Sequence, residues 1–179
     1  MDIFNAIKNR RSVRKFKPDS IPDEVIQRIL EAAQLAPSAG NLQARAFIII
    51  KDSKVKRKLC KSALNQTFIE EAPVNIVVCA DEAQSSSKYG SRGKVLYSII
   101  DATAAAENLL LAVHALGLGS CWIGAFEEEN VKKILNLPEG IKPIGIFPIG
   151  YPAEKPLPRD RLPLEAVVHK EKYETKKFN

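Results

Sequence analysis

Apolar residues along the chain follow two patterns, one with helical spacing and one of short continuous runs. Apolar positions that recur every third or fourth residue predict amphipathic helices. These helices are expected at 2–8, 21–33, 54–64, 95–116 and 128–135. Short runs rich in Ile and Val predict buried strands. Such strands are expected at 47–50, 75–80 and 144–149, with a further one at 120–123. Because helices and strands alternate, the chain is predicted to fold as an α/β or α+β sandwich.

The segments between these elements carry their own signals. Ser20-Ile21-Pro22-Asp23 is typical of a capping box with proline near the first helical turn. The cluster Pro37-Ser38-Ala39-Gly40-Asn41 predicts a loop, because Pro and Gly interrupt helices. The polar stretch 81–94 predicts a mobile loop. The last thirty residues are basic and marked by prolines, and they predict an extended arm that wraps around a partner surface and adds no packed layer.

The segment 95–116 is apolar on nearly all sides. A helix of that kind is buried all round, and in a domain of this size a second subunit is expected to cover part of it. Asp101, Glu107, Asn108 and His114 interrupt the hydrophobic region from 95 to 126. We therefore expect no membrane span.

The composition is that of an ordinary globular protein. The 179 residues are 45% hydrophobic and 27% charged, and they predict a single domain over 1–179. The isoelectric point near 9.2 permits nucleic-acid binding. No zinc-finger spacing or recognition-helix pattern accompanies it, so no nucleic-acid partner is expected.

The three cysteines, Cys60, Cys79 and Cys121, are widely spaced and form no CxxC pair. This spacing argues against a disulfide framework and against a metal site. The chain opens on Asp2 and an amphipathic pattern, which is unlike a signal peptide. A cytoplasmic location is therefore predicted.

Positive charge gathers at the two ends of the chain. The formal net charge is +6, and residues 1–17 hold six basic residues and one acid. Three arginines and a serine lie within Arg10-Arg11-Ser12-Val13-Arg14. Arginine binds phosphate through a planar fork of donors, and serine adds a hydroxyl. If the fold brings both ends together, they will form a focused anion site.

Two further segments are suited to a flat ligand. Residues 37–43 combine small residues, which let a ligand approach the backbone, with the side-chain amides of Asn41 and Gln43. In the segment 117–126, Gly124 allows close backbone approach, and Trp122 and Phe126 are candidates to flank a ring. No Ser/His/Asp constellation is visible, which favours an enzyme whose cofactor carries the chemistry.

Together these segments resemble the nitroreductase family of FMN-dependent oxidoreductases. The resemblance runs in order over nearly the whole chain. It is carried by Arg10 to Phe16, Pro37 to Gln43, Asp101 to Leu111, Gly117 to Gly124 and Pro158 to Pro163. It implies an α+β fold with a central, mostly antiparallel sheet flanked by helices, in a domain-swapped homodimer with an extended C-terminal arm and two FMN molecules at the interface.

The resemblance also implies a role for individual residues. Arg10 and Ser12 would hold the FMN phosphate or ribityl chain, and Arg14 would lie by the pyrimidine edge of the flavin. The backbone N–H of Gly124 would face flavin N5. The residues that would come from the other subunit are Pro37, Ser38, Ala39 and Asn41. The implied cofactor-binding residues are Arg10, Arg11, Ser12, Arg14, Pro37, Ser38, Ala39, Asn41, Gln43, Asn65, Ile123, Gly124, Arg159 and Arg161.

The implied reaction is a ping-pong electron transfer from NAD(P)H through FMN to a nitroaromatic, quinone or flavin acceptor, with no catalytic side chain. The chain departs from the family pattern at Ala44 and Arg45, where Pro and an aromatic residue are frequent, and at Gly124-Ala125, where Glu-Gly is frequent. These departures concern the substrate pocket, which residues 81–94 would line.

Two alternatives to this function stay open. One is a specialised flavoenzyme of the same fold, acting in dehalogenation or flavin fragmentation. The other is a non-enzymatic module that binds anions or nucleic acid.

Overall fold

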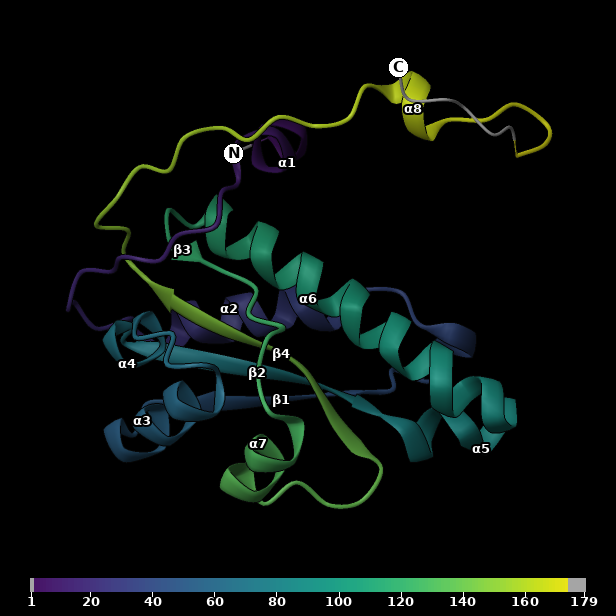
Figure 1. Cartoon of the computed structure of the whole chain (residues 1–179), viewed down its shortest axis with the longest axis horizontal. Coiled ribbons are helices and arrows are strands. Elements are labelled where there is room, and N and C mark those ends of the chain that lie inside the picture. The colour runs from purple at the N-terminus through teal and green to yellow at the C-terminus, as the bar shows by residue number, and fades with distance from the viewer. Residues whose placement is uncertain (1, 174–179) are drawn as a thin grey trace.

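Four antiparallel strands form one sheet within residues 2–173, the part of the chain that a computed structural model describes. The strand order is β1-β2-β4-β3. The strands are β1 (Arg45–Ile50), β2 (Val74–Asp81), β3 (Gly119–Ser120) and β4 (Ile141–Gly150). β2 and β4 are the long central pair, with a register shift between Val78 and Cys79 (Figure 1). The mixed helix and antiparallel-sheet architecture confirms the predicted fold class.

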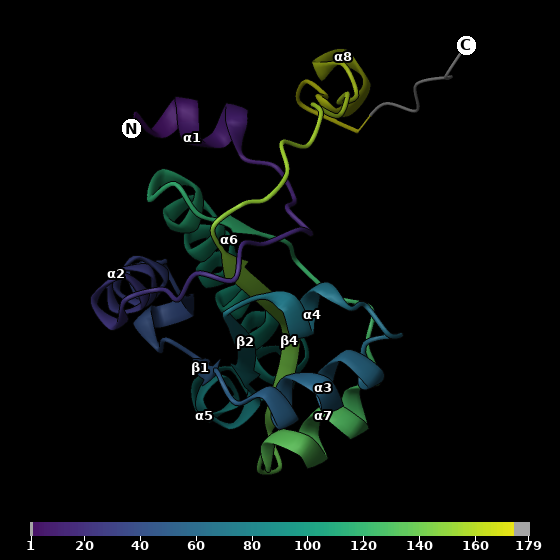
Figure 2. The ribbon, with the colours of Figure 1, turned by 90° about the vertical axis from the view of Figure 1, so that its left-hand side faces the viewer.

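Helices cover both faces of this sheet. Successive residues of a strand point to opposite faces, so β2 contributes Ile76 and Val78 to one core and Val77 and Cys79 to the other. The first core lies under α2 (Asp23–Gln34) and α6 (Ser98–Ala115). The second lies under α3 (Ser53–Ser62), α4 (Phe68–Glu71) and α7 (Glu128–Leu135). Figure 2 shows α2 and α6 on one side of the strands and α3 and α7 on the other.

The chain ends lie outside this sandwich. Helix α1 (Ile3–Asn9) begins at Asp2, whose side chain accepts a hydrogen bond from the N–H of Asn5 at 3.3 Å. After β4, the chain runs as an arm past the C-terminal end of α6 and past α1 (Figure 1). The arm contains one short helix, α8 (Leu164–Val167), and is otherwise extended in its described part. Up to residue 173 the arm adds no strand to the sheet, and its predicted role in a dimer stays a prediction.

The predicted mobile loop at 81–94 is wrong, because this segment is helical. Helix α5 (Glu82–Arg92) begins at Asp81, whose side chain accepts a hydrogen bond from the N–H of Gln84 at 2.8 Å. It bends at Gly90, where φ is +55°, and continues through a π-helical turn, η2 (Gly93–Tyr97), into α6. Ser85 is fully buried beneath Gly93, where a side-chain carbon would collide with the Ser85 carbonyl. Close packing thus stabilises a sequence of low helix propensity.

Two smaller expectations also need correction. The residue that precedes the first turn of α2 is Pro22, and no side chain caps this helix end, so the capping box at Ser20 does not form. The strand expected at 120–123 is reduced to Gly119–Ser120, and Ile123 forms an isolated bridge to Ile146. The helix and the strand are therefore present, but the helix lacks its predicted cap and the strand is shorter than predicted.

The continuous helical stretch Glu82–Ala115 is long and apolar enough to cross a membrane, with a mean hydropathy of 1.3 in its most apolar window. Length and composition therefore do not support the expectation that it falls short of a span. Its position in the fold gives the apolarity another reason, since Ala102, Ala106 and Leu109 are fully buried in the core against the sheet. Core helices satisfy the same criterion as membrane spans.

Candidate functional site

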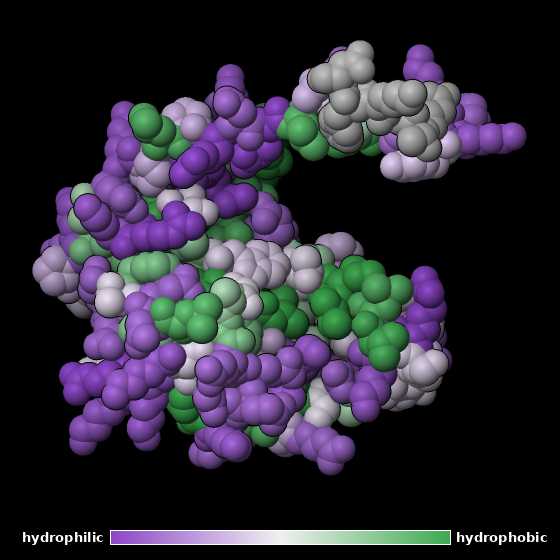
Figure 3. Space-filling view, in the orientation of Figure 1, coloured by the Kyte–Doolittle hydropathy of each residue, from purple (hydrophilic) through white to green (hydrophobic). Residues whose placement is uncertain are grey.

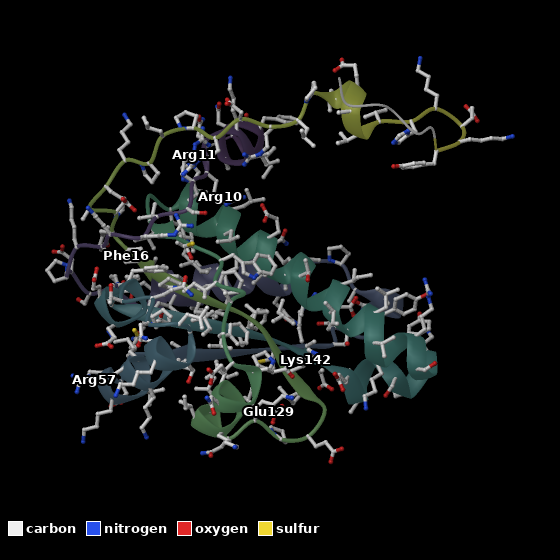
Figure 4. All side chains as sticks on the ribbon, in the orientation of Figure 1. Arg10, Arg11, Phe16, Arg57, Glu129 and Lys142 are labelled. Carbon is white, nitrogen blue, oxygen red and sulfur yellow. The ribbon has the colours of Figure 1, made fainter. Side chains whose placement is uncertain are left out.

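Residues 10–14, which follow α1, and residues 154–161 of the arm line one polar cavity of about 700 Å³. The cavity combines residues from the segment after α1 with residues from the arm. Its lining includes Arg10, Arg11, Ser12, Arg14, Glu154, Arg159 and Arg161. Figure 4 shows Arg10 and Arg11 between α6 and the arm. The fold thus brings part of each basic end segment to one cavity, and residues 174–179 lie outside the described structure.

The segment that carries the N-terminal arginines is fixed by backbone hydrogen bonds to the sheet edge. The N–H of Val13 donates to the carbonyl of Ser120 at 2.9 Å, and the N–H of Lys17 donates to the carbonyl of Tyr151 at 2.8 Å. Gly119 is required here, because a side-chain carbon at this position would lie 2.8 Å from Val13 Cβ. The positions of Ser12 and Arg14 therefore follow from strand-like pairing and not from a flexible tail.

Glu154 joins the arm to the same segment. Its Oε1 atom accepts hydrogen bonds from the N–H of Arg14 at 2.6 Å and from the N–H of Lys15 at 3.1 Å. Hydrogen bonds to a charged acceptor are stronger than neutral ones. Glu154 is an acid in a basic cavity that sequence reasoning missed, because only the fold shows that it binds backbone N–H groups.

Arg10 and Arg11 differ in how much of their donor capacity is in use. Arg11 Nη1 donates to the carbonyls of Lys8 and Arg10 at 2.8 Å each, so this guanidinium also caps the end of α1. Arg10 Nε lies 3.6 Å from Glu107 Oε1. The Nε atoms of Arg10 and Arg11 are buried and have no hydrogen-bond partner in the described part of the chain. Unsatisfied buried donors of this kind are suited to an anionic ligand.

A second, apolar cavity of about 500 Å³ adjoins the polar one. It lies between Arg10 and Arg11 and the C-terminal end of α6, and its lining includes Val113, His114 and Leu118. Burial lowers the pKa of His114, and the nearby charges of Arg10 and Arg11 lower it further. The imidazole therefore remains neutral beside the arginines.

The loop at 37–43 is held by buried charged groups from elsewhere in the fold. Asp101 of α6 is 2% exposed, and its Oδ1 atom accepts a hydrogen bond from the N–H of Ala39 at 2.9 Å. The Arg45 guanidinium donates from Nη2 to the carbonyls of Gln34 at 2.6 Å and Ala36 at 2.9 Å. Burial lowers the pKa of Arg45, while the charge of Asp101 raises it. Arg45, the departure from the family pattern, is thus part of the loop's support.

The loop itself has an unusual backbone. Gly40, Asn41 and Gln43 all have φ near +56°, with values of 57°, 56° and 55°. The N–H of Gln43 donates to Ser38 Oγ at 2.9 Å, and the Gln43 side-chain oxygen accepts a hydrogen bond from Gln34 Nε2 at 2.6 Å. The side chains of Ser38 and Gln43 therefore stabilise the loop from within.

The loop and the arginine cavity are separate within one chain. Asp101 contacts the loop and His114 lines the cavity beside the arginines, and both belong to α6. Thirteen residues of helix between them correspond to about 20 Å. One chain therefore does not bring residues 37–43 to Arg10 and Ser12, and the assignment of the loop to the other subunit's cofactor stays a prediction.

Asn65 and Gly124 lie in neighbouring segments. Asn65 adopts a φ of +57° after α3, and its N–H donates to the carbonyl of Cys60 at 3.0 Å. The next residue, Gln66, donates from Nε2 to the carbonyl of Ala125 at 3.2 Å. Ile123 anchors this second segment through its bridge to Ile146, which leaves Gly124 exposed. These two predicted residues are thus held near one another at the sheet surface.

The two aromatic residues proposed to flank a ring serve the core. Trp122 packs edge-on against Phe147, with ring centroids 5.1 Å apart. Phe126 packs against the second hydrophobic core. The expectation that both flank a ligand is therefore not supported.

The three cysteines lie in the interior of the described fold. Cys60, Cys79 and Cys121 are free and buried, and burial raises the pKa of Cys79 to about 12. A thiol with so high a pKa is a poor nucleophile at neutral pH. No group of three or more His, Cys, Asp or Glu residues that could hold a metal ion occurs among the described residues.

Comparison with known proteins identifies the class of protein that this fold defines. The model of the nitroreductase family matches residues 7–69 and 60–151. A Thermus thermophilus protein named NADH dehydrogenase is 35% identical over 195 residues, covering 94% of this chain and 95% of its own. A Bacillus subtilis protein named FMN reductase (NADPH) is 31% identical over 183 residues, covering 95% of this chain and 74% of its own.

A solved structure gives the same result. The NADPH:FMN oxidoreductase from Vibrio harveyi, complexed with NAD+, superimposes with a TM-score of 0.90 at 30% identity, covering 98% of this chain and 79% of that one. The chain belongs to the nitroreductase family, and the family resemblance expected from the sequence is confirmed. It is an enzyme of the oxidoreductase class.

Proposed function

We propose that this protein is an FMN-dependent oxidoreductase that takes electrons from NAD(P)H. The observation that carries the proposal is the polar cavity between residues 10–14 and the arm, which is lined by five arginines and by Glu154. Glu154 already binds two backbone N–H groups. The positive charge of the cavity is therefore available to an anionic group such as the FMN phosphate.

The residues of the cavity fit that phosphate. The buried Nε atoms of Arg10 and Arg11, which have no hydrogen-bond partner among the described residues, offer donors. Ser12 adds a hydroxyl, and the arm supplies Arg159 and Arg161. The related proteins named FMN reductase (NADPH) and NADPH:FMN oxidoreductase support FMN as the cofactor and a nicotinamide nucleotide as the electron donor.

Each part of the chain then has a role. Arg10, Ser12, Arg159 and Arg161 bind the phosphate and ribityl chain, with Arg11 beside them. Arg14 would hold the pyrimidine edge of bound FMN, where its positive charge would stabilise negative charge on the reduced ring. Asn65 would contact the same edge, and the backbone N–H of Gly124, next to Ile123, would be a donor to the flavin. Bound FMN supplies the redox chemistry by passing hydride equivalents from nicotinamide to acceptor. No side chain is required as an acid, base or nucleophile.

The remaining loop residues belong to the partner's site in this proposal. Each cofactor is contacted by the arginines of one copy and by the loop of the other copy. This arrangement accounts for the separation of loop and arginines within one chain. The loop residues are Pro37, Ser38, Ala39, Asn41 and Gln43. A homodimer also covers large apolar side chains that one copy exposes. Phe4 of α1 is 76% exposed, Leu157 of the arm 82% and Val95 of η2 66%. Figure 3 shows hydrophobic surface gathered over the corner of α5 and α6.

We propose a ping-pong mechanism, in which the nicotinamide nucleotide binds first and leaves, and the acceptor then binds at the same face of the flavin ring. Planar nitroaromatics, quinones and free flavin are the proposed acceptors, and we place the reaction in the cytoplasm. A specialised flavin chemistry such as dehalogenation or flavin fragmentation remains the second candidate. The names of the relatives, all of them oxidoreductases, argue against a non-enzymatic binding module.

The proposal is tested by titrating the purified protein with FMN. We expect one FMN per chain and a yellow protein. Arg10→Ala and Arg161→Ala should each weaken FMN binding by about 1.5–3 kcal/mol, the contribution of a hydrogen bond to a charged group. Arg57→Ala removes an exposed arginine of α3 and should leave the affinity unchanged. Equal FMN affinity in all three variants would refute the phosphate assignment, and a protein that takes up no FMN would refute the function.

A further inference from the structure

Helix α5 packs directly on the loop that the proposed function assigns to the flavin. Gln84 Nε2 donates to the carbonyl of Leu42 at 3.2 Å. At Gly40, a side-chain carbon would collide with Tyr89 Oη and lie 2.9 Å from Lys88 Nζ. Gly40 also has a φ of +57°, which favours glycine. The ends of the Lys88 and Tyr89 side chains therefore rest against the backbone of this loop.

The positive charges on this helix are not neutralised by acids. Lys88 Nζ lies 5.5 Å from the centroid of the Tyr89 ring. Arg92 Nε donates to Tyr97 Oη at 2.9 Å, and its Cζ lies 5.2 Å from the Tyr97 ring centroid. Among the described residues neither cation has an acidic partner within 4.0 Å, whereas the nearby Lys94 is paired with Glu82 at 3.7 Å.

The two tyrosines give these cations a common platform. The rings of Tyr89 and Tyr97 meet edge to face, with centroids 5.1 Å apart and an interplanar angle of 87°. The bend at Gly90 separates the two rings along the chain. The pair of Lys88 and Tyr89 thus contacts the loop at Gly40, and the pair of Arg92 and Tyr97 adjoins it through the contact between the two tyrosine rings. This arrangement suits a flat aromatic ligand that carries a negative charge.

We propose that Lys88 and Arg92, supported by Tyr89 and Tyr97, select planar aromatic substrates that bear an anionic group. The inference rests on the proposed function, because that function places the adjoining loop at the flavin. The anionic group is either a carboxylate on the electron acceptor or a phosphate of the nicotinamide nucleotide. In both cases the cations attract the charge while the ring lies over the flavin.

The test is equilibrium binding to the FMN-loaded protein without any reductant, followed by the change in the flavin absorption spectrum. The probes are two matched pairs: 4-nitrobenzoate with the neutral 4-nitrobenzamide, and NADP+ with NAD+. The variants are Lys88→Met and Arg92→Met. Lys61→Met, which removes an exposed lysine of α3, is the control with the same change in net charge.

We expect each test variant to raise the dissociation constant of at least one charged probe by about tenfold, as for one hydrogen bond to a charged group. The neutral 4-nitrobenzamide and the control variant should change less than twofold. A loss confined to 4-nitrobenzoate assigns the anion to the acceptor, and a loss confined to NADP+ assigns it to the nucleotide phosphate. Unchanged binding of 4-nitrobenzoate and of NADP+ overturns the proposal. A loss of affinity for 4-nitrobenzamide as large as that for 4-nitrobenzoate also overturns it.

The result separates this inference from the proposed function. If the protein binds FMN and the variants show no charge discrimination, only the role of Lys88 and Arg92 falls. If the wild-type protein takes up no FMN, both fall together. Unchanged thermal unfolding of the variants excludes a general loss of structure as the cause of weaker binding.

Discussion

The backbone N–H of Arg14 donates a 2.6 Å hydrogen bond to Oε1 of Glu154, which lies 140 residues further along the chain. Lys15 donates to the same oxygen at 3.1 Å. One carboxylate thereby joins the first segment of the chain to the arm. Because the bond uses the Arg14 backbone, the Arg14 guanidinium stays available to the polar cavity.

Glu154→Ala should release the arm from the segment after α1. It removes two hydrogen bonds to a charged acceptor at a partly exposed site, so we expect the free energy of unfolding to fall by about 1.5 kcal/mol. FMN affinity should fall as well, because Arg159 and Arg161 lose their fixed position. Urea denaturation and FMN titration measure the two effects. Glu139→Ala, at an exposed position, is the control. A Glu154→Ala protein as stable as this control would show that Glu154 does not hold the arm to the segment after α1.

Asp101→Ala should disorder the loop at 37–43, because the N–H of Ala39 loses its acceptor and Arg45 loses the nearby negative charge. Breaking a buried hydrogen bond of this kind should lower the free energy of unfolding by about 1–3 kcal/mol. Asp101→Asn keeps an acceptor oxygen and should lose less. Amide hydrogen exchange at residues 38–43 is the direct measurement. Unchanged protection in Asp101→Ala would contradict the assigned support.

His114 should make stability depend on pH. Burial and the neighbouring arginines lower the pKa of His114 in the folded protein below 6.5, the ordinary pKa of a histidine side chain. As the pH falls through about 6.5, the unfolded chain binds a proton that the folded chain does not, so the folded state loses stability. Between pH 8 and pH 5.5 the wild type should lose more unfolding free energy than His114→Gln. Parallel pH curves for the two proteins would show that His114 titrates normally.

The apolar patterns predicted most helices and strands because burial against one sheet imposes their period. Helix α5 was missed since Ser, Gly and Lys dominate it, and its burial of Ser85 under Gly93 is a tertiary effect. The aspartate at position 81, which caps α5, was the one local signal that could have indicated a helix start.

The candidate site was predictable only in part. Charge near the two chain ends indicated the arginine cavity, because arginine presents a planar fork of donors that matches phosphate. The contacts of Glu154 and Asp101 join residues 140 and 62 positions apart, and no local pattern marks such pairs. The contact of Trp122 with Phe147 could not be predicted either, because an aromatic residue near a glycine has the same sequence pattern in a core and in a binding site.

A second copy of the chain should be present in solution. The exposed apolar side chains of α1, η2 and the arm, among them Phe4, Val95 and Leu157, give the reason. Sedimentation at low micromolar concentration should show one dimeric species. Phe4→Asp together with Leu157→Asp should weaken the dimer, whereas Lys61→Asp on α3 should not. A stable monomer that binds FMN would contradict both the dimer and the assignment of the 37–43 loop to the partner's site.

The central claim is that flavin bound by these residues accepts electrons from a nicotinamide nucleotide. Anaerobic stopped-flow mixing of the FMN-loaded protein with NADH and with NADPH tests it most directly. We expect the flavin band to bleach with at least one nucleotide and to return on addition of a quinone or nitroaromatic. Arg14→Ala should slow the bleaching by about tenfold or more, and Cys60→Ser should leave it unchanged. A flavin band that neither nucleotide bleaches would contradict the account.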